Sequence, residues 1–205
     1  MKIVGRLAIL TLAAFGAGIL FQRSIGLGIF MDWLGLPKGR ESQSSVCARV
    51  QHLQALGIPS EAIVFIGDSL VEQHEWQEVF AGHKVVNRGV TGARIRDLIG
   101  AFDYSKSKAV FCMIGVNDLG QGASLDEFRE TYRLLLAGIG EDVRFHAISI
   151  PAIQRYGGKE IDADAIRKAN TTIKELASRQ EFLYVNIFAI STEHQPKFLP
   201  RTGCT

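Results

Sequence analysis

Short apolar runs rich in β-branched and aromatic residues alternate with amphipathic segments along most of the chain. Runs of this kind are typical of buried strands, and their alternation with helical segments predicts a parallel sheet with helices on both faces. The sequence therefore predicts an α/β fold with a sheet of about five strands. These strands are expected at Ala62 to Ile66, Lys84 to Asn87, Lys108 to Ile114, Val143 to Ile150 and Phe182 to Ile187.

Capping residues mark two of the helices between these strands. Ser124 followed by Glu127 is a capping-box pattern, and Gly138 follows the apolar positions that come after it. Asp162 or Asp164 can cap a second helix. Both helices have one apolar face, made by Phe128, Tyr132, Leu135 and Leu136 in the first and by Ile166, Ala169, Ile173 and Leu176 in the second.

The N-terminal segment differs from the rest of the chain. Lys2 and Arg6 precede an uncharged run from Leu7 to Phe21, the arrangement of an export signal. That run is shorter than the ~20 residues of a membrane span, although a second apolar stretch follows it. We expect residues 1–36 to be a cleaved signal peptide or an uncleaved membrane anchor, and the protein to be exported. An apolar helix packed on a soluble domain is the alternative.

Residues 37–45 (PKGRESQSS) are polar and rich in turn formers, which predicts a linker before a domain over 46–205. A hydrophobic content of 47% with 21% charged residues suits one domain with a core. The 23 basic and 21 acidic residues form no basic runs, so nucleic acid is not an expected partner. No metal-ligand spacing and no glycine-rich phosphate loop occurs, and no cofactor is expected.

Small and polar residues follow three of the predicted strands: Gly67-Asp68-Ser69, Asn87-Arg88-Gly89 and Gly115-Val116-Asn117-Asp118. In an open α/β sheet, ligands bind at the carboxyl ends of the strands, where the strand order reverses. If the order is 2-1-3-4-5, the loops after the first and third strands face each other across that point. Ser69 and Asn117 would then share one crevice.

These residue types suit acyl transfer. The Ser69 hydroxyl can be a nucleophile, and the backbone N–H groups of Ser69 and Gly89 with the side-chain amide of Asn117 can hold an oxyanion. Asp68 and Asp118 are expected to support the loops by hydrogen bonding to amides. Taken one at a time, Ser69 could be a helix cap, Gly89 a turn glycine and Asn117 part of a turn.

The segments VFIGDSLVEQ, VVNRGVTG and MIGVNDLGQG resemble, in this order, the first three motif blocks of the GDSL/SGNH family of serine ester hydrolases. The resemblance implies a three-layer αβα, flavodoxin-like fold in which Ser69 is the nucleophile. It also implies an oxyanion hole made by the amides of Ser69 and Gly89 with Asn117, and catalysis without a cofactor. The implied substrates are small-molecule carboxylic esters: short acyl esters, thioesters, lysophospholipids or sugar O-acetyl groups.

The sequence departs from the family in its last motif block, Asp-x-x-His, which occurs nowhere in the chain. A chain truncated before the catalytic loop is the leading explanation. His194, or Glu193, bending back to act as the base is the second, and a non-catalytic or degenerate relative that binds an acyl or glycan ligand is the third. Because a serine hydrolase needs a base, we expect weak or no turnover from the chain as given.

Overall fold

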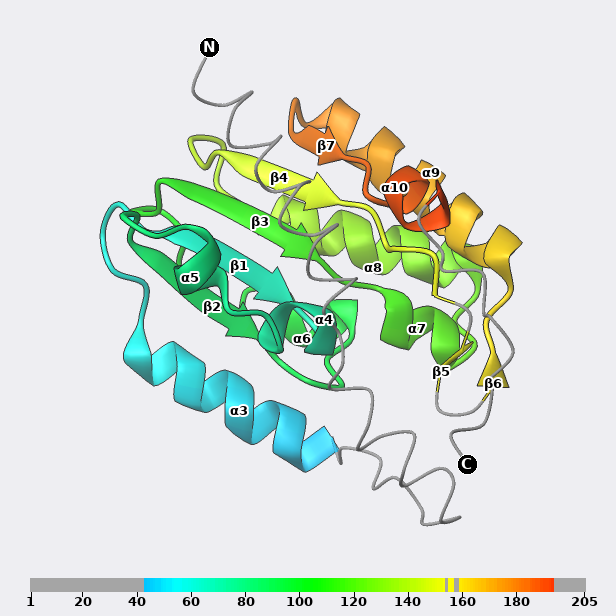
Figure 1. Cartoon of the computed structure of the whole chain (residues 1–205), viewed down its shortest axis with the longest axis horizontal. Helices are drawn as coiled ribbons and strands as arrows, with labels where there is room; N and C mark the ends of the chain where they lie inside the picture. The colour runs from blue at the N-terminus through cyan, green and yellow to red at the C-terminus, as the bar shows by residue number, and fades with distance from the viewer. Residues whose placement is uncertain (1–42, 154, 157–158, 194–205) are drawn as a thin grey trace, which may run out of the picture.

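The computed structural model describes residues 43–153, 155–156 and 159–193. Its centre is a five-stranded parallel sheet of order β2-β1-β3-β4-β7, seen as a row of arrows pointing the same way in Figure 1. This order and all the expected strands are confirmed. The strands are β1 (Ile63–Gly67), β2 (Val85–Gly89), β3 (Ala109–Met113), β4 (Phe145–Ile148) and β7 (Leu183–Val185). A small antiparallel pair, β5 (Arg155–Tyr156) and β6 (Lys159–Glu160), was not expected from the sequence.

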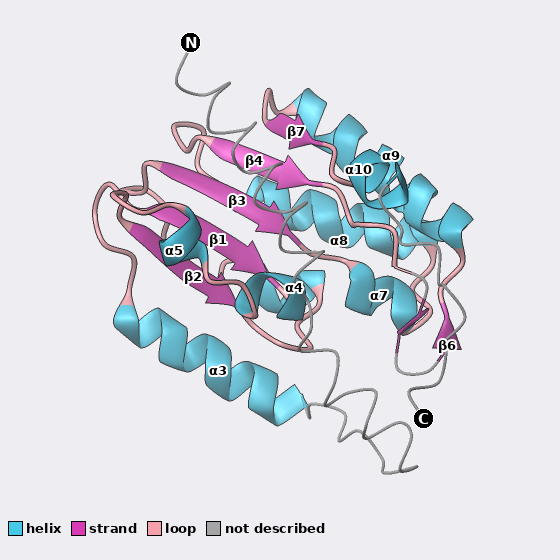
Figure 2. Cartoon of the chain, in the orientation of Figure 1, coloured by secondary structure: helices cyan, strands magenta, loops and turns pink. Residues whose placement is uncertain are grey.

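Helices occupy both sides of the sheet (Figure 2). Ser124 accepts a hydrogen bond of 3.1 Å from the Glu127 N–H at the start of α8. Asp162, rather than Asp164, caps α9. The helices are α3 (Gln43–Leu56), α4 (Ser69–Glu72), α5 (Trp76–Val79), α6 (Ile95–Leu98), α7 (Val116–Gly120), α8 (Leu125–Ala137), α9 (Ala163–Arg179) and α10 (Phe188–Glu193).

The core has two layers, one on each face of the sheet. Along β1, Val64 and Ile66 pack in the cluster that includes buried residues of α3, α6, α8 and α9. Phe65 points to the opposite cluster, where it stacks on Trp76 of α5 with ring centroids 4.0 Å apart. Alternate burial on both faces accounts for the continuously apolar sequence of the strand. The three-layer αβα arrangement is thus confirmed, and Trp76 belongs to the core.

Helix α3 begins at Gln43, earlier than the sequence predicted. Residues 43–45, which were expected to belong to the linker, are helical. Val46 is the first buried side chain of the helix, and Val50 and Leu53 continue its buried face. The extra turn is held by Gln43, which donates to Asp97 (3.0 Å) and accepts from Arg96 (2.9 Å). Contacts between residues this far apart in the chain cannot be predicted from the local sequence.

The segment expected to be a signal peptide or anchor, residues 1–36, lies outside the described residues, as does His194. Within the part of the chain that the structure covers, no helix has the length and apolar character needed to cross a membrane.

Two core side chains carry groups that could be mistaken for catalytic ones. His146 of β4 is buried and stacks on Phe111, with ring centroids 4.3 Å apart. Burial lowers the pKa of His146 to about 4, and Arg144 acts in the same direction, so the ring is neutral at pH 7. Its Nδ1 has no hydrogen-bond partner in the described ranges. Cys112 is fully buried, and burial raises the pKa of its thiol.

Candidate active site

The turn after β1 brings Ser69 to the carboxyl edge of the sheet. Gly67 has φ +157°, and a Cβ there would lie 2.0 Å from the carbonyl oxygen of Met113, so the position requires glycine. Asp68 caps α4, and its Oδ1 accepts from the Leu70 N–H at 2.9 Å. Ser69 is the first residue of α4 and is half-buried. In the described part of the chain, no group is hydrogen bonded to the Ser69 hydroxyl.

Asp68 is buried, with only 1% of its surface exposed. Burial raises its pKa from 3.8 to about 7, and the nearby charge of Asp118 acts in the same direction, while the bond from Leu70 opposes the change. Its Oδ2 has no hydrogen-bond partner among the described residues. Asp68 therefore holds the turn through one oxygen, and burial keeps its carboxyl protonated to a higher pH than an exposed aspartate.

Asp68→Asn is expected to reduce the pH dependence of stability. The folded-state pKa of about 7 exceeds the ordinary value of 3.8, so the folded state binds this proton more tightly than the unfolded state does. The Asp68 contribution is therefore fully present below the lower value and is lost as the pH rises through the higher one. The variant keeps an oxygen for Leu70 and releases no proton. Between these pH values its free energy of unfolding should fall by about 4 kcal/mol less than that of the wild type.

Urea unfolding at several pH values measures this difference, with exposed Asp126→Asn as the matched control. Parallel pH profiles for the wild type and Asp68→Asn would contradict it.

The expected role of Gly89 as an oxyanion donor does not fit the structure. Its N–H donates to the side-chain oxygen of Asn87 at 2.9 Å and is therefore already engaged. A Cβ on Gly89 would lie 2.3 Å from the backbone nitrogen of Glu72. Gly89 instead lets α4 pack directly against the end of β2.

Asn87 fastens α4 to the same strand. Its Nδ2 lies 3.0 Å from the carbonyl oxygens of both Val71 and Glu72, and 3.2 Å from that of His74. From the sequence, Asn87 was one of the polar residues that follow a predicted strand, with no role of its own. A polar side chain placed at the strand end, two residues before a glycine, is the feature that could have indicated it.

A tight turn after β2 offers a different amide. The Ala93 N–H donates to the Val90 carbonyl at 3.0 Å, and Gly92 between them has φ +80°, which only glycine adopts readily. Within the described ranges, no hydrogen bond involves the Gly92 N–H. Gly92 was missed from sequence, although the Thr-Gly pair after a predicted strand is a turn pattern.

Asn117 joins this turn to the loop after β3. It is 3% exposed, and its Nδ2 donates to the Ala93 carbonyl at 2.6 Å. Because the amide carries two N–H groups, one remains for a ligand. The adjacent Asp118 accepts from the Ile95 N–H at 3.1 Å. Ser69, Gly92 and Asn117 thus lie on the loops that follow three neighbouring strands, with Ser69 on the middle one.

Polar side chains surround a small hollow beside Asp118. Burial raises the pKa of Asp118 to about 6, and the bond from Ile95 opposes this change. The hollow has a volume of about 110 Å³. It is lined by Arg94, Arg96, Asp118, Gln121, Gly122, Ala123, Glu127 and Thr131.

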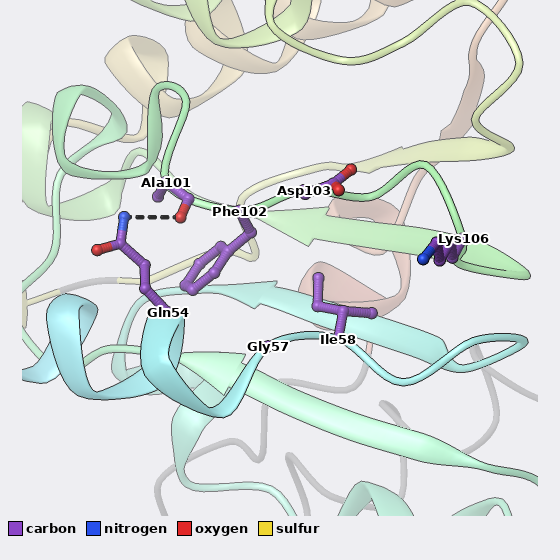
Figure 3. A pocket seen from close by; sticks show the side chains of 7 residues that line it. All are labelled: Gln54, Gly57, Ile58, Ala101, Phe102, Asp103 and Lys106. Atoms are coloured by element: carbon purple, nitrogen blue, oxygen red, sulfur yellow. Dashed lines mark hydrogen bonds between the residues drawn. The ribbon is translucent and has the colours of Figure 1, made fainter.

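A larger cavity of about 230 Å³ lies elsewhere, at the segments that lead into β1 and β3 (Figure 3). The Gln54 amide crosses part of it to the Ala101 carbonyl at 2.8 Å. It is lined by Gln54, Gly57, Ile58, Ala101, Phe102, Asp103 and Lys106 and contains none of the candidate catalytic residues.

The strand order of the sheet and the position of Ser69 after strand β1 are those of SGNH hydrolases. The sequence profile of the GDSL-like lipase/acylhydrolase family matches residues 65–202, and the chain belongs to this family. No curated protein matches the chain.

Solved structures with the same fold include several esterases. A protein from Streptococcus pneumonia, whose name refers to platelet activating factor, is 23% identical over 82% of each chain, with a TM-score of 0.63. An acetyl xylan esterase from Geobacillus stearothermophilus is 22% identical over 66% of this chain and 81% of its own, with a TM-score of 0.52. AlinE4, an SGNH-hydrolase family esterase, is 18% identical over 72% and 87%, with a TM-score of 0.51.

Proposed function

We propose that this protein is a serine ester hydrolase with Ser69 as its nucleophile. The observation that carries the proposal is the position of the half-buried Ser69 at the start of α4. Strand β1, which leads to Ser69, lies between β2 and β3, the strands that lead to Gly92 and Asn117. Membership of the acylhydrolase family supports the same reaction class.

In the proposed reaction, the Ser69 Oγ attacks the carbonyl carbon of an ester while a base takes the hydroxyl proton. The new O–C bond leaves negative charge on the former carbonyl oxygen. The N–H groups of Ser69 and Gly92 and the second Asn117 N–H stabilise this oxyanion. Its collapse breaks the bond to the alcohol, which leaves with the proton, and water then hydrolyses the acyl-serine to release the acid and restore Ser69.

The reaction requires a base that takes the proton of the Ser69 hydroxyl. The Ser69 hydroxyl makes no hydrogen bond with any of the described histidines. We propose His194 for this role because in the sequence it directly follows α10, the helix that comes after the last strand of the sheet. His194→Ala should then slow acylation of Ser69, and an unchanged rate would exclude it.

We propose short acyl esters of polar alcohols as the substrate class. The polar lining of the hollow beside Asp118 supports a hydroxylated leaving group, and a structural neighbour is named as an acetyl xylan esterase. Hydrolysis of p-nitrophenyl acetate, p-nitrophenyl decanoate and an acetylated sugar tests this proposal. Activity should be highest on the acetyl esters. A preference for the decanoate would contradict the substrate assignment but leave the reaction class intact.

Asn117→Ala is expected to lower kcat on p-nitrophenyl acetate by about 100-fold, the scale observed when one oxyanion donor is removed. KM should change little because the lost hydrogen bond is strongest in the transition state. Steady-state kinetics measure both constants, with buried Asn170→Ala as a comparison away from the site. A rise in KM at unchanged kcat would assign Asn117 to substrate binding instead.

Export also stays a proposal. We propose that residues 1–36 direct the chain across a membrane, either as a cleaved signal or as an anchor. Fractionation of the full chain, combined with its N-terminal sequence, tests this. An intact N-terminus in the soluble intracellular fraction would contradict both forms.

A further inference from the structure

Glu72 lies one turn after Ser69 and reaches across to the Gly92 turn. Its Oε2 accepts from the Thr91 N–H at 2.6 Å, a short distance typical of a bond to a charged acceptor. Its Oε1 lies 3.4 Å from Nε of Arg49 on α3. One carboxylate therefore joins the nucleophile helix, the donor turn and the first described helix.

The bond to Thr91 holds the peptide between Val90 and Thr91, which comes one before the peptide that carries the Gly92 N–H. At the other end of the same turn, the Ala93 carbonyl is held by Asn117 at 2.6 Å. The turn is thus fixed on one side from the helix that carries Ser69 and on the other from the loop that carries Asn117. Since the Thr91 and Gly92 amides share this short turn, the contact that fixes one constrains the direction of the other.

The ion pair with Arg49 has a secondary role. The Glu72 side chain is 27% exposed and that of Arg49 is 44% exposed, so solvent screens their attraction. The pair orients the carboxylate towards Thr91 and adds little to global stability.

We propose that Glu72 is a positioning residue that aims the Gly92 N–H at the oxyanion formed on a Ser69-bound ester. The inference rests on the proposed function, because it assigns Glu72 a role in that reaction. It predicts an effect on the acylation rate that exceeds any effect on substrate binding or on folding.

Glu72→Ala should lower the rate constant for acylation by p-nitrophenyl acetate about 10- to 100-fold. This loss in rate is no larger than the loss expected when a whole oxyanion donor is removed. KM and the melting temperature should stay close to those of the wild type. Glu72→Gln keeps an acceptor oxygen for Thr91 and should recover most of the rate. Glu78→Ala, which removes an exposed glutamate from α5, is the matched control and should acylate like the wild type.

Amide resonances of the ¹⁵N-labelled full chain report the geometry separately from catalysis. The Thr91 proton should resonate far downfield in the wild type, and both the Thr91 and Gly92 signals should shift in Glu72→Ala. Shifted resonances with an unchanged acylation rate would overturn the positioning role. A wild-type chain that does not acylate would overturn the proposed function, and this inference with it, whereas equal rates in a reactive wild type and Glu72→Ala would overturn this inference alone.

Discussion

Ser69→Ala is expected to reduce the release of p-nitrophenol from p-nitrophenyl acetate to the rate of the buffer. The alanine has no Oγ, so no acyl-enzyme can form. An activated ester is the appropriate probe because its leaving group departs without a proton, which places the least demand on the base. Loss of the nucleophile lowers kcat by about 10⁶-fold in subtilisin, and with His194 as the base we expect a fall of at least about 10³-fold here, whereas a chain without a base would show only the weak turnover expected from the sequence.

The matched comparison is Ser178→Ala, an exposed serine of α9 whose hydroxyl donates to the Lys174 carbonyl of the same helix. It should keep its stability and its rate, because the change removes only a surface hydroxyl away from the site loops. Retention of the wild-type rate in Ser69→Ala would mean that another group reacts with the ester.

Gly89→Ala is expected to disable the site although it keeps every backbone N–H. The added Cβ would lie 2.3 Å from N and 2.6 Å from Cα of Glu72, so α4 must move away from β2. This movement displaces Ser69 and breaks the Asn87 bonds to the α4 carbonyls. We expect a loss of about 3 kcal/mol or more in the free energy of unfolding and a fall in acylation of at least about 100-fold.

Urea unfolding and burst kinetics measure the two effects. Gly140→Ala is the control, because a Cβ there meets only an ordinary contact of 3.5 Å with Val143. A stable, fully active Gly89→Ala chain would show that α4 does not depend on this close approach.

The sheet could be predicted because its central strands are buried on both faces. In β1, all five residues are buried, so the sequence IVFIG is almost continuously apolar and easily read as a strand. The helix caps Ser124 and Asp162 were equally visible, since capping depends on residues only two or three positions apart. The start of α3 was not visible, because Gln43 is held by partners on α6.

The site could be predicted only in part. The strand-end motifs identified the loops of Ser69 and Asn117, but sequence could not show which glycine N–H was engaged. The Gly89 N–H is engaged because it donates to the side-chain oxygen of Asn87. Nothing in the local sequence requires the Asn87 side chain to make this bond. The Glu72 contact with Thr91 joins residues 19 positions apart, a separation at which local patterns carry no information.

The assignment of Ser69 as the nucleophile is tested most directly by intact-protein and peptide mass spectrometry of the full chain after treatment with a fluorophosphonate. The reagent bonds to an activated serine and needs no turnover. We expect a single adduct on the peptide that contains Ser69, and no adduct in Ser69→Ala. An unmodified Ser69 after prolonged treatment, or an adduct on a different serine, would contradict the assignment of Ser69 as the nucleophile.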